Sequence, residues 1–233
     1  MNSNRSHLVE LTLEAFRLAH EAATAAAQGI ATGNKELLAS VRKYERDLDG
    51  LDRDVDDLVT TTITQVSAPE AHELLACMKF VIALERIGDL LLSFANRADS
   101  VAQRIDRQDA EDLARMASRL EHMVATVQSA FSNRSLDAAV DVLRSDSELD
   151  RLRNLIVLRH LEPATDDTRQ ESFHVVFMAQ ELERAGDHTK NMAEEVCHLV
   201  SGHTVRHVLR SYDRPVEQMF IEHLRRQQGE HSR

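Results

Sequence analysis

The chain has 233 residues, 42% of them apolar, with 7 glycines, 3 prolines and no tryptophan, which predicts an all-α protein with its own hydrophobic core. Its formal net charge of −11 at pH 7 argues against partners that need a basic surface, namely nucleic acids and anionic lipids. No apolar run is long enough to span a membrane, and no basic-then-apolar signal opens the chain. We therefore expect a cytoplasmic protein without direct membrane insertion.

The first two helices are predicted by the spacing of apolar residues. Between residues 8 and 29, apolar and small residues recur every three or four positions, as they do on one face of a helix. The Thr-Gly-Asn sequence at 32–34 ends this helix. The same spacing continues over residues 37–58, and so short a break indicates two antiparallel neighbours.

A third helix is expected to begin at Ser67, because Glu70 follows three residues later as in a capping box, and to run to about Arg107. The same order of helices then repeats in the second half of the chain. Further helices are expected over residues 109–132 and 136–161, and from a second capping box at Thr168 and Glu171. We thus expect two tandem three-helix bundles related by an internal repeat, over residues 1–106 and 107–210, with a C-terminal tail over 211–233.

The repeat is clearest in a short motif. Leu84-Glu85-Arg86-Ile87-Gly88-Asp89 recurs 98 residues later as Leu182-Glu183-Arg184-Ala185-Gly186-Asp187. In each copy the Glu and the Asp lie one helical turn apart on the same face. A glycine inside a helix costs about 1 kcal/mol relative to alanine, so its recurrence indicates a close approach by another helix or by a ligand that the carboxylates hold.

Carboxylates with this spacing are the candidate metal ligands. Glu85 and Asp89 interrupt an apolar helix face, and a carboxylate in such a place must be paired, protonated or bound to a cation. Pairs with the same spacing lie on the preceding helix of each half, so antiparallel helices would bring four carboxylates together, as hard cations prefer. The predicted ligands are Glu45, Asp49, Glu85 and Asp89 in the first half and Asp146, Asp150, Glu183 and Asp187 in the second.

Other interpretations of these residues stay open. Acidic pairs four residues apart are common in so acidic a chain and often belong to a solvated helix face. Arg86 and Arg184, which follow each motif Glu, have two interpretations: a partner that positions a carboxylate or reaches a phosphate, or a structural salt bridge across the bundle. Glu171-x-x-His174 and Glu195-x-x-His198 match the motif of ferritin-like di-metal proteins, but both lie on one predicted helix rather than on facing helices.

The two motif copies, with Asn191-Met192-Ala193-Glu194-Glu195 after the second, resemble the paired signatures of the PhoU family of phosphate-signalling regulators. The resemblance covers nearly the whole chain. It implies two similar three-helix bundles, a homodimer, and iron, zinc, manganese or magnesium bound through the acid pairs. It further implies a cytoplasmic protein that is not an enzyme.

The resemblance also implies partners and a role. The partners are the ATPase subunit of the phosphate ABC transporter and the phosphate-sensor histidine kinase. The role is negative regulation of the phosphate-starvation response when phosphate is plentiful. Two alternatives belong to other classes: a carboxylate-bridged metal-binding or storage bundle, and a PhoU-like companion of another phosphate transporter.

Overall fold

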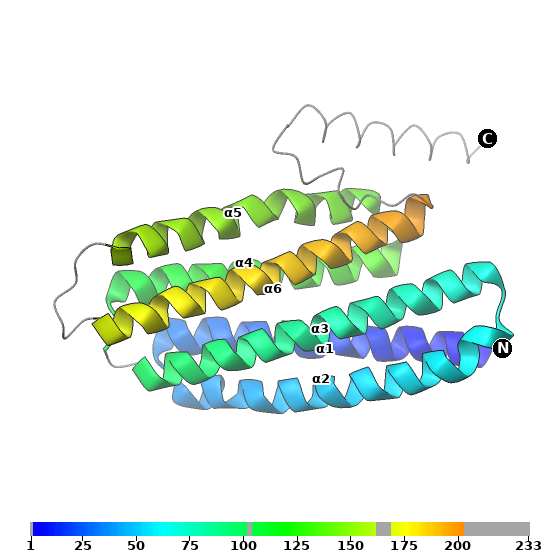
Figure 1. The fold of residues 1–233 in the computed structure, drawn as a ribbon, viewed down its shortest axis with the longest axis horizontal. Helices are drawn as coiled ribbons and strands as arrows, with labels where there is room; N and C mark the ends of the chain where they lie inside the picture. Colours follow the sequence, from blue (N-terminus) through cyan, green and yellow to red (C-terminus); the bar gives the residue numbers. More distant parts are fainter. Residues whose placement is uncertain (1, 102–103, 162–168, 203–233) are drawn as a thin grey trace.

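The computed structural model describes residues 2–101, 104–161 and 169–202, and this part of the chain is built of long helices (Figure 1). The expected tail over 211–233 and the capping residue Thr168 lie outside these residues. In chain order the elements are α1 (Asn2–Thr32), α2 (Lys35–Thr62), the short 3-10 helix η1 (Ile63–Gln65), α3 (Ala68–Val101), α4 (Arg107–Asn133), α5 (Leu136–Leu161) and α6 (Arg169–Ser201). None of the described helices is both long and apolar enough to cross a membrane.

The helices form two bundles of three. Helices α1, α2 and α3 pack against one another, and so do α4, α5 and α6. The bundles meet where α1 lies against α4 and where α3 lies against α6, and Figure 1 shows that α3 and α6 run in opposite directions. The predicted all-α fold of two tandem three-helix bundles is confirmed.

The two bundles share one hydrophobic core. Its centre is a group of three buried aromatic rings from both bundles: Phe16 of α1, Phe80 of α3 and Phe131 of α4. The ring centroids of Phe80 and Phe131 lie 5.0 Å apart at an interplanar angle of 67°, which is the favoured edge-to-face arrangement. Since the core continues from one bundle into the other, the bundles hold α3 and α6 in a defined register.

The helix ends follow the local sequence. Gly33 has a φ of +67°, which glycine adopts without strain, and the Asn34 side chain caps α2. The capping box at α3 is confirmed, because the backbone N–H of Ser67 donates to Oε2 of Glu70 at 2.9 Å.

Helix α3 is shorter than predicted. It ends at Val101 rather than near Arg107. The Val101 carbonyl accepts the N–H groups of Arg104 and Ile105 at 2.7 and 3.0 Å, which closes the last turn. Asp106 then accepts the Gln108 N–H at 2.8 Å as the N-cap of α4, and the extended backbone of that cap cannot continue α3.

Candidate functional site

The acid pairs of the first half lie on facing helices. Glu45 and Asp49 are one turn apart on α2, and Glu85 and Asp89 are one turn apart on the antiparallel α3. Burial raises the pKa of Glu45, and the charges of Asp49 and Asp89 raise it further. Because Asp89 comes from the other helix, the two pairs share one electrostatic environment.

Asp52 of α2, which was not among the predicted ligands, belongs to the same group. Burial raises the pKa of Glu85, and among the neighbouring carboxylates Asp89 contributes most, followed by Asp52 and Asp49. Burial and nearby acids likewise raise the pKa of Asp52. We call Glu45, Asp49, Asp52, Glu85 and Asp89 the N-terminal cluster.

Arg86, which follows Glu85 in the motif, lies at the edge of this cluster. Arg86 has a side chain that is 59% exposed, and its nitrogen atoms lie 3.4 Å from Glu85 Oε2 and 3.5 Å from Asp89 Oδ2. These are pairs within one helix, not the bridge across the bundle that the sequence left open. Exposed pairs of this kind contribute little. Arg42 and Arg46 lower the pKa of Glu45, and Arg53 lowers that of Asp52, yet both pKa values remain raised, so burial and the neighbouring acids prevail.

The corresponding acids of the second half also face each other. Asp146 and Asp150 lie on α5, and Glu183 and Asp187 lie on α6. Burial raises the pKa of Asp187, and the charge of Asp146 adds to that effect. Burial and the charge of Asp187 raise the pKa of Glu183. We call these four residues the C-terminal cluster.

The C-terminal cluster differs from the N-terminal cluster in that it contains two basic side chains. Lys190 donates to Asp146. A guanidinium nitrogen of Arg153 lies 3.3 Å from Glu183 Oε1 and 3.9 Å from Asp150 Oδ1. The repeat places Lys190 where the first half has Leu92, and Arg153 where it has Asp52. The N-terminal cluster therefore concentrates negative charge, whereas the acids of the C-terminal cluster already have basic partners in Lys190 and Arg153.

The donor chemistry of the N-terminal cluster fits a hard cation, because the cluster offers only carboxylate oxygens as ligands. These oxygens are not drawn tightly together, however. Among the described residues, the eight predicted ligands contain no group of three whose donor atoms all lie within 4.8 Å of one another. A cation at this place would have to draw the side chains inward.

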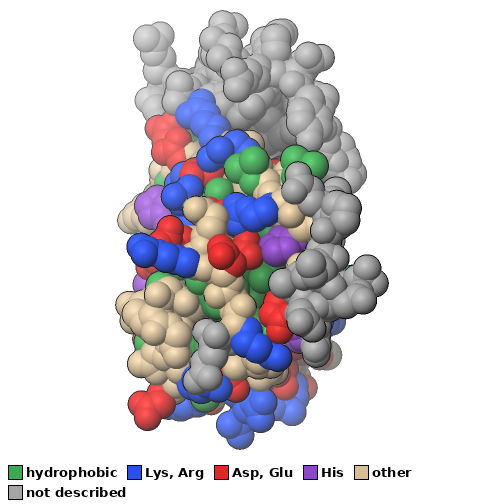
Figure 2. All heavy atoms as spheres, turned by 90° about the vertical axis from the view of Figure 1, so that its left-hand side faces the viewer, with side chains coloured by type: hydrophobic (Ala, Val, Ile, Leu, Met, Phe, Trp, Pro, Cys, Tyr) green, Lys and Arg blue, Asp and Glu red, His purple; other side chains and the backbone are tan. Residues whose placement is uncertain are grey.

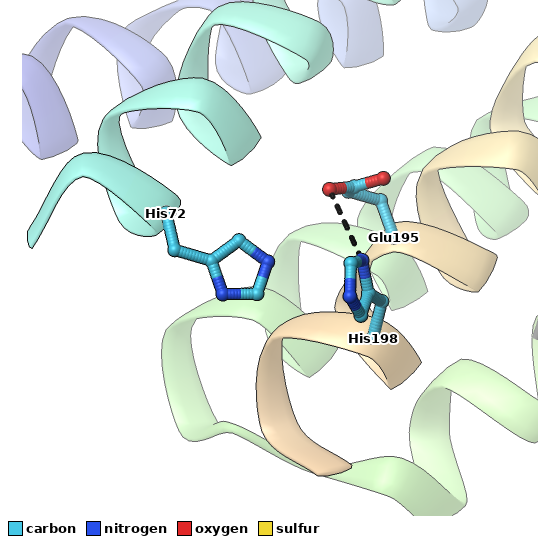
Figure 3. A group of neighbouring side chains, drawn as sticks. All are labelled: His72, Glu195 and His198. Atoms are coloured by element: carbon cyan, nitrogen blue, oxygen red, sulfur yellow. Dashed lines mark ion pairs between the residues drawn. The ribbon is translucent and has the colours of Figure 1, made fainter. Parts of the chain in front are cut away.

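A group that meets this distance lies elsewhere, between α3 and α6. It consists of His72, Glu195 and His198 (Figure 3). The Glu195-x-x-His198 motif was visible in the sequence, but His72 is far away in the chain. Only the packing of α3 against α6 brings the third residue to the other two.

A second network, which the sequence did not predict, links α4, α5 and α6 at one end of the bundle. His160 of α5 contacts Asp109 of α4 through Nε2 and Ser172 of α6 through Nδ1, each at 3.0 Å. Arg159 donates to Asp109 and also to Asp112, and both carboxylates are buried. Figure 2 shows this end, where basic and acidic side chains are interspersed. The pairing of charges indicates a structural role.

Comparison with known proteins supports the repeat and the fold. The PhoU domain matches the chain twice, over residues 12–98 and 113–196. The chain is 29% identical over 197 residues to the phosphate-specific transport system accessory protein PhoU homolog of Zymomonas mobilis, with 82% of this chain and 83% of that protein covered. It is 26% identical over 209 residues to the Pseudomonas aeruginosa homolog, with 88% and 85% covered.

Two crystal structures share the fold. The PhoU of Pseudomonas aeruginosa superimposes with a TM-score of 0.78 at 23% identity, which covers 87% of this chain and 99% of that one. The phosphate transport system regulatory protein PhoU of Streptococcus pneumoniae gives a TM-score of 0.76 at 17% identity, covering 88% and 98%.

Proposed function

The chain belongs to the PhoU family, and we propose that it is a regulatory adaptor of phosphate uptake that binds metal ions through its paired carboxylates. The relatives are phosphate-specific transport system accessory proteins, a regulatory rather than an enzymatic class, and we assign this chain the same non-enzymatic role. The observation that carries the proposal is the pair of family matches, each of which contains one complete set of facing acid pairs.

The metal would bind first in the N-terminal cluster. Glu45, Asp49, Glu85 and Asp89 would supply the oxygens, and iron, zinc, manganese and magnesium are all compatible with such donors. In the C-terminal cluster, Asp146, Asp150, Glu183 and Asp187 would take a cation only after Lys190 and Arg153 move away. Bound cations would neutralise and order an acidic surface, and so change what a partner protein meets.

The proposed partners are the ATPase subunit of the phosphate ABC transporter and the phosphate-sensor histidine kinase. The adaptor would act as a cytoplasmic homodimer and keep the phosphate-starvation response off when phosphate is plentiful. The printed name of the relatives, accessory protein of a phosphate-specific transport system, supports the transporter as a partner.

A complementation experiment tests the proposal. In a strain that lacks this gene, the wild-type chain should restore repression of alkaline phosphatase in high phosphate and should retain the ATPase subunit in a pull-down. The double variant Glu85→Gln/Glu183→Gln should lose both, while Glu10→Gln, an exposed acid on α1, should behave as wild type. Wild-type chain that neither represses nor binds would contradict the adaptor function, and unchanged behaviour of the double variant would contradict the role of the acids.

A further inference from the structure

The three side chains that meet between α3 and α6 carry an inference of their own. We propose that His72, Glu195 and His198 form a site for one divalent first-row transition metal of the zinc type, separate from both carboxylate clusters. One ligand atom from each residue lies within 4.8 Å of the other two. The rings of His72 and His198 are packed edge to face with centroids 4.6 Å apart, and Figure 3 shows Glu195 beside them.

The donor set distinguishes this site from the acid pairs. Two imidazole nitrogens and one carboxylate oxygen are the ligands of many zinc sites that keep a fourth position for water or substrate. Imidazole also favours Zn²⁺, Co²⁺ and Ni²⁺ over Mg²⁺ and Ca²⁺, which prefer oxygen alone. Glu195 and His198 are three residues apart on α6, so they project from neighbouring turns toward the same side. His72 completes the set from the facing helix.

The charge of Glu195 already requires a positive partner. Its side chain is only 6% exposed, and a carboxylate buried to this degree is costly unless it is paired. Nζ of Lys79 lies 2.7 Å from Oε1 of Glu195, and Nδ1 of His198 lies 3.8 Å from the same oxygen. The Lys79 side chain is 44% exposed, so its ammonium group can return to water when a metal ion takes its place. Lys79 and the metal therefore compete for one oxygen atom.

A pocket adjoins the site on the Glu195 side, and of the three proposed ligands only Glu195 lines it. This pocket of ≈ 310 Å³ lies between α3 and α6 beside Glu195, and Lys79, Ala83 and Asn191 contribute to its wall. Asn191, the first residue of the signature segment after the second motif, thus lines this pocket.

In the part of the chain that the structure describes, this group of ligands is found at one end of the α3–α6 contact. The repeat maps Lys79 onto Phe177 and Glu195 onto Arg97 at the opposite end. There the guanidinium of Arg97 lies 4.8 Å from the centre of the Phe177 ring, and Nε of Arg97 donates to Glu181 at 2.9 Å. An aromatic ring and an arginine offer no metal ligands in those positions, so we expect one metal ion of this histidine-ligated type per chain, apart from any cation in the carboxylate clusters. That ion would join α3 of the first bundle to α6 of the second.

Metal titration of the full chain tests this inference. After removal of metal with a chelator, Co²⁺ is added in the presence of excess Mg²⁺, which occupies all-oxygen sites, and visible absorption is recorded. We expect one equivalent of Co²⁺ to give the intense bands of a site with nitrogen ligands and low coordination number, and Zn²⁺ to displace it. Absence of these bands would overturn the proposal.

Variants identify the ligands. His72→Asn and His198→Asn should each weaken Zn²⁺ binding at least about tenfold, measured by calorimetry. His122→Asn is the matched control, because His122 is an exposed histidine on α4, and it should bind as wild type. Circular dichroism of the metal-free variants verifies that they are folded. Folded histidine variants with unchanged affinity would contradict the site.

Two further variants separate this site from its alternatives. Lys79→Met should tighten Zn²⁺ binding about twofold to fivefold, because it removes the competing cation; unchanged affinity would show that Glu195 is not a ligand. Glu85→Gln/Asp89→Asn should leave the Co²⁺ bands intact, so failure of the carboxylate proposal and failure of this one have different signatures. Loss of the bands in that variant would assign them to the N-terminal cluster and overturn the inference.

Discussion

Gly88 of α3 lies so close to Leu48 of α2 that a Cβ atom on Gly88 would come within 2.8 Å of Leu48 Cδ1. The repeat reproduces this contact, because a Cβ on Gly186 would lie 2.5 Å from Leu149 Cδ1. Both leucines are fully buried and cannot move aside freely. Of the two reasons considered for the motif glycines, the structure supports the approach of a neighbouring helix. That approach also places the acid pairs of the two helices beside each other.

Replacement of Gly88 by alanine should therefore destabilise the protein. Alanine gains up to about 1 kcal/mol in helix propensity, but overpacking against Leu48 costs about 1–3 kcal/mol. We expect a net loss of about 1 kcal/mol in the free energy of unfolding, measured by urea titration. Gly50→Ala is the control: it is also inside a helix, its added Cβ meets nothing within 4 Å, and it should stabilise by about 0.5–1 kcal/mol. Equal effects of the two substitutions would contradict this account.

The acids of the N-terminal cluster should make stability depend on pH. The pKa of Glu85 is raised above its ordinary value of 4.5, so the folded state binds more protons than the unfolded state as pH rises past that value. Stability is then greatest below the unfolded pKa and falls as pH rises through the folded pKa. Without divalent cations, Glu85→Gln should unfold at a higher temperature than wild type at pH 7 and should lose this advantage near pH 4. A variant that is less stable than wild type at pH 7 would argue that Glu85 is well paired.

The two clusters should respond differently to added cations. Mn²⁺ should raise the melting temperature of wild type through the N-terminal cluster, and Glu85→Gln/Asp89→Asn should lose most of that increase. Glu183→Gln/Asp187→Asn should keep it, because Lys190 and Arg153 already compensate the C-terminal cluster. Lys190→Met should make the second cluster responsive, so that calorimetry detects an additional Mn²⁺. Equal losses in the two double variants would refute this asymmetry.

The ion pairs at the end of the bundle should contribute differently to the free energy of unfolding, according to how deeply they are buried. Arg159→Ala removes the partner of two buried carboxylates, Asp109 and Asp112, and should cost about 1–3 kcal/mol in the free energy of unfolding. Arg107→Ala removes a pair with Glu111 at the same end, at 2.8 Å but with a side chain that is 92% exposed, and should cause no measurable change. Thermal unfolding of both variants, compared at one pH, checks the difference.

The helices and their grouping were predictable because they depend on information that is local or repeated. The spacing of apolar residues identifies the buried face of a helix, whichever element that face packs against. Helix caps such as Ser67 with Glu70 involve residues within one turn of each other. The motif around Gly88 and Gly186 identified the repeat directly. The error at the end of α3 arose because Asp106, which caps the next helix, was not recognised as the stop.

The sequence could not predict which acids have basic partners, because that depends on which helices face each other. Lys190 and Arg153 look like ordinary surface residues in the chain, yet they lie against acids of the C-terminal cluster. Nothing in the sequence joins His72 to Glu195 and His198, since these residues belong to different halves and meet only where α3 packs on α6.

The sequence by itself thus determined an all-helical, duplicated protein and the positions of its acid pairs, because periodicity, capping and repetition are properties of neighbouring residues. Only the packing of the helices decided which carboxylates lie among other acids, which have basic partners, and where two histidines meet a buried glutamate. Electrostatic energy depends on distance in space and on exclusion of water, and both are established only when the two bundles pack together.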